Sequence, residues 1–218
     1  MTNRDSSRRP AGRPRAALPF PALLAVAALA AGCTGLLQPR PDPTRFWVLR
    51  AAAGAPGVAA AAATRHRSYG VGPVGIPDYL KRPGVITRAS GARVEPSAID
   101  RWAEPLDKGV PRVLAENLRL LLGTDRIVLY PWYASSRPDL QVAIGFEQFE
   151  RGPDGEALLA ATWTIRRTGD GATLRTGETR TRIAPGTPDT EGAVLAQGEA
   201  LAALAREIAA AIEALPAR

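Results

Sequence analysis

The sequence predicts an α/β fold (α+β in looser usage), in which a single mixed, largely antiparallel sheet is packed with two amphipathic helices. Three observations support this prediction. Apolar and polar residues alternate in successive segments between 140 and 183, which is typical of half-buried strands joined by tight turns. Apolar residues recur at helical spacing at about 108–122 and again at about 190–215. The 218 residues, 45% hydrophobic and 22% charged, suit one domain with an appendage.

Residues 1–32 have the organisation of a secretory signal peptide. Five arginines occur in the first fifteen residues, and residues 16–31 form an apolar run that ends at Gly32 and Cys33. A transmembrane helix needs about 20 apolar residues, so this run is too short to span a bilayer. Since the leader arginines supply most of the formal charge of +7, that charge does not indicate nucleic-acid binding.

The segment Leu29–Cys33 resembles the lipobox of bacterial lipoproteins, with Ala30 at the position that is usually leucine. The resemblance implies cleavage between Gly32 and Cys33 and lipidation of Cys33. The alternative is a free cysteine after an ordinary signal peptide. If Cys33 is lipidated, residues 33–44 are the lipidated cysteine and a proline-rich tether. The eleven tether residues, 34–44, reach at most about 35–40 Å when extended. Thr34, by the same resemblance, implies sorting to the outer membrane.

The chain has one cysteine and one histidine, so the sequence offers no metal site and no catalytic residue. His66 lies between two arginines after an alanine-rich tract, where an exposed linker position is expected. No glycine-rich phosphate loop precedes a helix. We therefore expect no cofactor and no enzymatic activity.

Residues 45–218 form the predicted domain, which begins with short strands. The expected elements are a strand at 45–50, a flexible loop at 51–64, a strand at 68–74 that ends at Pro73 or Pro77, and a hairpin of 85–87 with 93–95. Next comes the segment Ile99–Leu106, which we interpret as a structured loop pinned by Trp102, because Pro105 is unsuited to a central strand. Asp100 and Glu104 are interpreted as acceptors that fix this loop, in preference to a general acid or base.

The second half of the domain has stronger patterns. The expected helix at 108–122 has Pro111 in its first turn and Gly123 as its stop signal. A strand at 126–131 follows, and then three strands that form an antiparallel meander, with Trp163 in the core. In the last helix, at about 190–215 with Thr190 as N-cap, apolar residues recur every seven positions. We expect this stripe to pack on the domain's own sheet, with a partner helix as the alternative.

Three motifs occur in a recognisable order: Val71-Gly72-Pro73-Val74, the run Tyr79–Arg88, and Arg101-Trp102-Ala103-Glu104-Pro105-Leu106. Together with the lipobox they resemble the PqiC-type ABC-type transport auxiliary lipoprotein family, over roughly residues 45–215. One departure is Lys81, where the family commonly has aspartate. The resemblance implies a signature, structural or docking in role, that consists of Arg82, Pro83, Arg88, Arg101, Trp102, Glu104, Pro105 and Leu106.

The family resemblance also implies a function. It predicts a lipoprotein anchored in the outer membrane and facing the periplasm, where it is a non-catalytic docking component of an MCE-type ABC transport system. Such systems move phospholipid or other apolar cargo between the inner and outer membranes. The implied partners are an MCE-domain subunit, the outer membrane and, often, further copies of the chain. One alternative is a stand-alone lipid-binding lipoprotein with a cavity between helices and sheet, and another, disfavoured, is a periplasmic hydrolase.

Overall fold

The computed structural model describes residues 41–52 and 66–216. The expected signal peptide, Cys33, most of the tether and nearly all of the expected loop at 51–64 lie outside these residues. The chain from Pro43 to Arg218 forms one compact unit. Its strands are β1 (Arg45–Trp47), β2 (Tyr69–Gly75), β3 (Gly84–Ser90), β4 (Arg93–Trp102), β5 (Ile127–Leu129), β6 (Leu140–Arg151), β7 (Ala157–Arg167) and β8 (Thr173–Ile183). Its helices are α3 (Leu106–Leu122) and α4 (Thr190–Glu213), with short 3-10 turns η2 (Asp78–Lys81) and η3 (Ala134–Ser136).

The eight strands form one mixed sheet that divides at β6. On one side, β6 pairs antiparallel with β7 along its whole length, and β7 pairs antiparallel with β8. On its other side, the first half of β6 pairs parallel with β2, and its last residue pairs with β3. β2 in turn pairs with β5, whereas β3 pairs with β4, and β4 pairs with β1. The predicted meander and the predicted mixed sheet are therefore confirmed, and β1 and β5 end two different branches.

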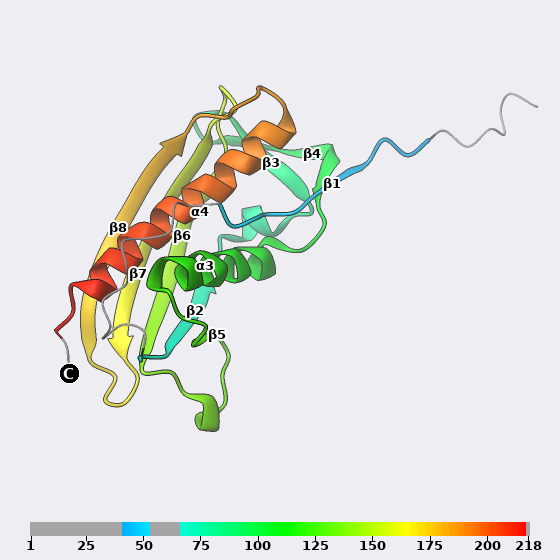
Figure 1. The fold of residues 1–218 in the computed structure, drawn as a ribbon. Coiled ribbons are helices and arrows are strands. Elements are labelled where there is room, and N and C mark those ends of the chain that lie inside the picture. Colours follow the sequence, from blue (N-terminus) through cyan, green and yellow to red (C-terminus); the bar gives the residue numbers. More distant parts are fainter. Residues whose placement is uncertain (1–40, 53–65, 217–218) are drawn as a thin grey trace, which may run out of the picture. The chain divides into compact units, whose positions relative to one another are not determined.

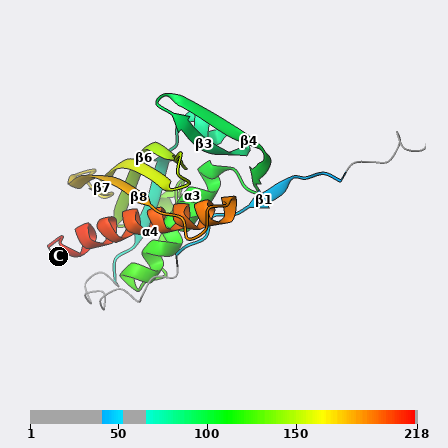
Figure 2. The ribbon, with the colours of Figure 1, turned by 90° about the horizontal axis from the view of Figure 1, so that it is seen from above.

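Both helices cover the same face of the sheet (Figure 1, Figure 2). α3 lies over β2 and β5, α4 lies over β7 and β8, and the two helices pack against each other. Their buried stripes are the predicted ones and include Leu114, Leu118, Leu201, Leu204 and Ile208, each fully buried. The seven-residue stripe of α4 thus packs within the domain. Figure 2 shows the β3–β4 hairpin rising from the other side of the sheet.

The segment after β1 crosses the helices and is held tightly. Leu49 is 1% exposed. The Arg50 carbonyl oxygen approaches α4 at Gly198 so closely that a Cβ at that position would lie 2.8 Å from it. The glycine at position 198 therefore allows the segment after β1, which we call the strap, to lie against α4.

Two local predictions were wrong, and for a third the structure agrees with one of its two alternatives. The segment Ile99–Trp102 is the end of β4 and not a loop, because Pro105 lies beyond the last ladder pair and removes no strand hydrogen bond. β2 continues through Pro73 and ends at Gly75, which agrees with Pro77 as the stop; the register with β6 shifts between Val71 and Val74 and spares the missing donor of Pro73. Pro111 lies in the second turn of α3, since the helix starts at Leu106.

The boundaries of the helices differ from the predicted ones in detail. Gly123 ends α3 in the left-handed conformation with φ 58°, as predicted. At the start of α4, the N-cap is Asp189 and not Thr190, because the Asp189 carboxylate accepts a 2.9 Å hydrogen bond from the Gly192 amide. Thr190, one position later, is free to use its hydroxyl elsewhere.

Candidate functional site

The signature residues lie where β4 passes into α3. The Trp102 amide donates to the Pro83 carbonyl at 2.7 Å, which joins the start of β3 to the end of β4. Trp102 is 7% exposed, and Leu106 is buried as the first residue of α3. Pro105 precedes that helix, and its carbonyl accepts hydrogen bonds from the amides of Lys108 and Gly109. These positions form a rigid strand-to-helix junction.

Asp100 is the centre of the polar contacts at this junction. Its Oδ1 accepts a 2.9 Å hydrogen bond from the Trp47 indole, and its Oδ2 accepts a 3.1 Å bond from the Thr190 hydroxyl. Arg45 adds an ion pair whose Nε–Oδ1 distance is 2.9 Å. The Asp100 side chain is 9% exposed. One carboxylate therefore ties the first strand of the domain to β4 and to the start of α4.

The environment of Asp100 has opposing effects on its pKa. Burial alone raises the pKa, but hydrogen bonds from Trp47, Thr190 and Arg45, with the Arg45 charge, lower the pKa of Asp100 below its ordinary value of 3.8. The carboxylate is therefore ionised at neutral pH and acts as an acceptor. Every one of its contacts in the described chain is structural.

Glu104, two residues before the start of α3, has a comparable structural role. It forms an ion pair with Arg112, and the same guanidinium donates a 3.0 Å hydrogen bond to the Leu49 carbonyl. Arg112 thereby holds the strap after β1 against α3. The prediction that Asp100 and Glu104 are fixing acceptors agrees with these contacts, although the element that Asp100 fixes is a strand.

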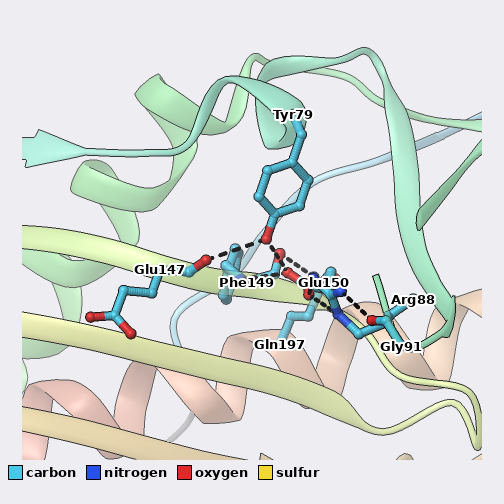
Figure 3. Close-up of polar contacts among 7 residues, drawn as sticks. All are labelled: Tyr79, Arg88, Gly91, Glu147, Phe149, Glu150 and Gln197. Atoms are coloured by element: carbon cyan, nitrogen blue, oxygen red, sulfur yellow. Dashed lines mark hydrogen bonds and ion pairs between the residues drawn. The ribbon is translucent and has the colours of Figure 1, made fainter. Parts of the chain in front are cut away.

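Arg88, another signature residue, forms an ion pair with the fully buried carboxylate of Glu150. Glu150 is 0% exposed, and its Oε1 accepts a 2.7 Å hydrogen bond from Arg88 Nε (Figure 3). A second ion-pair contact, from Arg88 NH2 to the same oxygen, is 2.5 Å. The hydrogen bond to Glu150 raises the pKa of Arg88, so the guanidinium keeps its charge.

Glu150 lies at the point where the sheet divides. β2 leaves β6 after Gly145 and β3 joins it only at Arg151, so no strand pairs with this side of β6 in between. The Phe149 amide, which would otherwise lack a partner, donates to Glu150 Oε2 at 3.0 Å, and the Phe149 carbonyl accepts from Gln197 of α4 at 3.5 Å (Figure 3). Side chains thus replace the missing ladder.

Tyr79 of η2 completes this cluster from the loop between β2 and β3. Its hydroxyl donates to Glu150 Oε2 at 2.7 Å and lies 3.3 Å from the Glu147 carbonyl (Figure 3). Burial, reinforced by the neighbouring Glu150 carboxylate, raises the pKa of Tyr79. The phenol therefore stays protonated and serves as a donor.

Two signature arginines have a different environment. The side chains of Arg82 and Arg101 are exposed, and neither forms an ion pair with any residue in 41–52 or 66–216. His66 is also exposed, as expected, and its backbone carbonyl accepts from Arg126. No group of three or more His, Cys, Asp or Glu in the described part of the chain could hold a metal ion. None of the described helices is long and apolar enough to cross a membrane.

The sequence model of the ABC-type transport auxiliary lipoprotein component family matches residues 48–209. The chain belongs to this family. The match spans the junction, the dividing sheet and most of α4. The family is defined by an auxiliary role in transport and does not correspond to an enzyme class. No curated protein sequence matches the chain.

Two crystal structures share the fold of this auxiliary lipoprotein. The first is an uncharacterised protein with 19% identity and a TM-score of 0.62, in an alignment that covers 78% of this chain and 98% of the other. The second is a Xanthomonas campestris protein described as a DUF330 member, with 14% identity and a TM-score of 0.59, covering 75% and 92%.

An exposed aromatic cluster, which sequence reasoning missed, lies between β5 and η3. We call Tyr130, Trp132 and Tyr133 the aromatic tip. Tyr130 and Tyr133 are 53% and 83% exposed, and the Tyr130 and Trp132 rings meet edge to face at 5.3 Å. Three aromatic residues in four positions were the available signal. The proline at 131 was interpreted only as the end of a strand.

Replacing Asp100 by asparagine tests the junction. We expect Asp100→Asn to lower the free energy of unfolding by roughly 2–3 kcal/mol at pH 7, because charge-assisted hydrogen bonds are lost. Because the folded pKa is depressed, this stabilisation is complete above about pH 3.8 and disappears as pH falls through the lower folded pKa. Urea titrations at several pH values should show the two proteins converging in acid. Asp154→Asn, in an exposed turn, is the control and should change little; a constant difference down to pH 2 contradicts the assignment.

Removing the charge that faces Glu150 tests the divided sheet. Arg88→Met should cost roughly 3–5 kcal/mol, because it leaves a buried carboxylate unpaired. The double variant Arg88→Met/Glu150→Gln should recover part of this loss, since the remaining group is neutral. Arg93→Met, which removes an exposed pair with Glu95, should change stability by less than about 1 kcal/mol. Equal effects of Arg88→Met and Arg93→Met in denaturant unfolding would show that the buried pair is not important.

Proposed function

We propose that this chain is a non-catalytic docking component of an MCE-type ABC transport system. In this proposal it is anchored in the outer membrane through Cys33, faces the periplasm and serves the movement of phospholipid or other apolar cargo between the two membranes. The observation that carries the proposal is the family match over residues 48–209. The site adds support, because the carboxylates of Asp100, Glu104 and Glu150 are bound within the fold.

The carboxylates argue for a structural use of the charges in the signature. Asp100 accepts from β1 and α4, Glu104 is paired with Arg112, and Glu150 is fully buried against Arg88. A general acid or base must reach a substrate proton, and these groups are occupied by partners within the domain. A domain whose three described carboxylates of this kind all have partners within the fold suits a docking role.

The aromatic tip is the surface that we assign to the transporter partner. Tyrosine and tryptophan are enriched among the residues that contribute most to protein–protein binding, and Tyr133 is the most exposed large hydrophobic residue described. The tip follows β5, which ends one branch of the sheet, while β1 follows the tether and ends the other. This arrangement separates the anchored strand from the proposed docking surface.

Copurification tests both the partner and the surface. Full-length tagged protein, extracted in mild detergent, should retain an MCE-domain subunit. Tyr133→Ser should reduce the recovered subunit about tenfold or more, since loss of such an aromatic contact costs on the order of 1–2 kcal/mol. Leu120→Ser is the matched control, because Leu120 is a 58% exposed hydrophobic residue on α3. Absence of any MCE subunit would end the functional proposal, whereas normal recovery with Tyr133→Ser would reject only the aromatic tip as the surface.

The anchor is tested by Cys33→Ser. Without the thiol no acyl chain can be attached, so we expect the protein to leave the outer-membrane fraction. Membrane fractionation followed by immunoblotting measures this loss, and Thr34→Ser, which keeps the cysteine, is the control. Unchanged outer-membrane association of the Cys33→Ser protein would rule out lipidation as the anchor.

A further inference from the structure

An open groove lies at the end of the domain where β6 starts, β7 turns into β8 and the chain leaves α4. Its volume is about 880 Å³. Apolar side chains from all three segments line it, with Leu140 from β6, Leu174 from β8 and Leu215 from the chain after α4. These segments lie close together at the same end of the sheet (Figure 1). The groove is thus separate from the polar junctions described above and from the space between helices and sheet.

The rim of this groove is basic. Arg67, Arg137 and Arg167 line it, together with a single carboxylate, Asp139. Asp139 is already occupied, because it accepts hydrogen bonds of 2.7 and 2.8 Å from the Ser68 amide and hydroxyl. These bonds, above all the one from the Ser68 amide, and the nearby charge of Arg67 lower the pKa of Asp139, so it remains an anion.

Two of the rim arginines form no direct ion pair with a carboxylate among the described residues. Arg167 forms an ion pair with Asp170 at 2.7 Å. Arg67 donates to the neutral carbonyl of Pro216 at 2.9 Å, and the exposed Arg137 has no hydrogen-bonding partner among the described residues. The groove therefore combines an apolar wall with a basic rim whose charge is only partly offset by Asp139.

We infer that this groove binds a single anionic amphiphile, with its phosphate at Arg67 and Arg137 and its acyl chain along the leucine wall. Guanidinium groups bind phosphate through paired, charge-assisted hydrogen bonds. Burial of methylene groups against Leu140, Leu174 and Leu215 favours a ligand that carries a hydrocarbon chain. Inorganic phosphate alone would leave that wall exposed to water. The inference does not depend on the proposed docking role.

Titration calorimetry with three probes tests this site. The protein is the chain from position 33 onward, carrying Cys33→Ser so that no acyl chain of its own is present. Palmitoyl lysophosphatidylglycerol, below its micelle concentration, should bind at least about tenfold more tightly than palmitoyl lysophosphatidylcholine. Inorganic phosphate should give no measurable heat of binding.

Variants then separate head from chain recognition. Arg137→Gln should weaken binding of the anionic lysolipid about tenfold and leave the zwitterionic one nearly unchanged. Leu174→Ser should weaken both lysolipids to a similar degree, with circular dichroism to verify folding. Arg93→Gln, at an exposed hairpin position, is the control for general charge and should bind both as before.

Four results would overturn the inference. The first is no binding by the folded protein, and the second is equal affinity for both lysolipids with no effect of Arg137→Gln. The third is phosphate binding as tight as that of the anionic lysolipid, which identifies a free-phosphate site. The fourth is lipid binding only after deletion of residues 53–63, which identifies the chain's own segment as the occupant. A protein that binds lysolipid but recovers no MCE subunit keeps this site and loses the docking role.

Discussion

The buried carboxylate of Glu150 is the constraint on which the sheet depends. β6 has one neighbour along its entire length on one side, but two strands share its other side and leave a gap between Gly145 and Arg151. An unpaired backbone amide in that gap would be costly, and Glu150 satisfies it. The same carboxylate binds Arg88 of β3 and Tyr79 of η2, so the β3 branch and the loop that leads to it from β2 are fixed at a single group.

The same principle recurs at the other end of the β3 branch. Asp100 joins β1, β4 and α4, and the pair of Glu104 with Arg112 holds the strap after β1. Asp100 satisfies groups from elements that are distant in the sequence, and Glu104 orients an arginine that does so. The charged residues that most resemble a catalytic site therefore stabilise the fold, because they join its elements. What remains available for partners is at the surface, in the aromatic tip and in the groove at the start of β6.

The sequence predicted the parts of the fold that depend on local periodicity. The strand alternation from Leu140 onward and the helical stripes of α3 and α4 are properties of neighbouring residues, so they could be read directly. The environment of Asp100 could not be predicted from the sequence, because its partners Arg45 and Thr190 lie 55 and 90 positions away. The division of the sheet was equally hidden, since Tyr79 and Glu150 are 71 positions apart.

Turn residues explain the remaining errors. The proline at 105 was taken as evidence against a strand, although it lies beyond the strand's end. Pro73 was one of two expected stops, although a register shift accommodates it within the strand. The aromatic tip was visible in the sequence as three aromatics in four positions. The groove was not visible in the sequence, because its lining residues come together only in the folded domain; they include Arg67, Leu140, Leu174 and Leu215.

Hydrogen exchange of the Phe149 amide, measured by NMR, tests most directly whether Glu150 fixes the divided sheet. If the carboxylate replaces the missing strand, this amide should exchange only through global unfolding, at the same free energy as the amides paired between β6 and β7. Its protection should fall in the Glu150→Gln protein while the β6–β7 amides remain protected. Rapid exchange of Phe149 in the unmodified protein, alongside a protected β6–β7 ladder, would contradict this account.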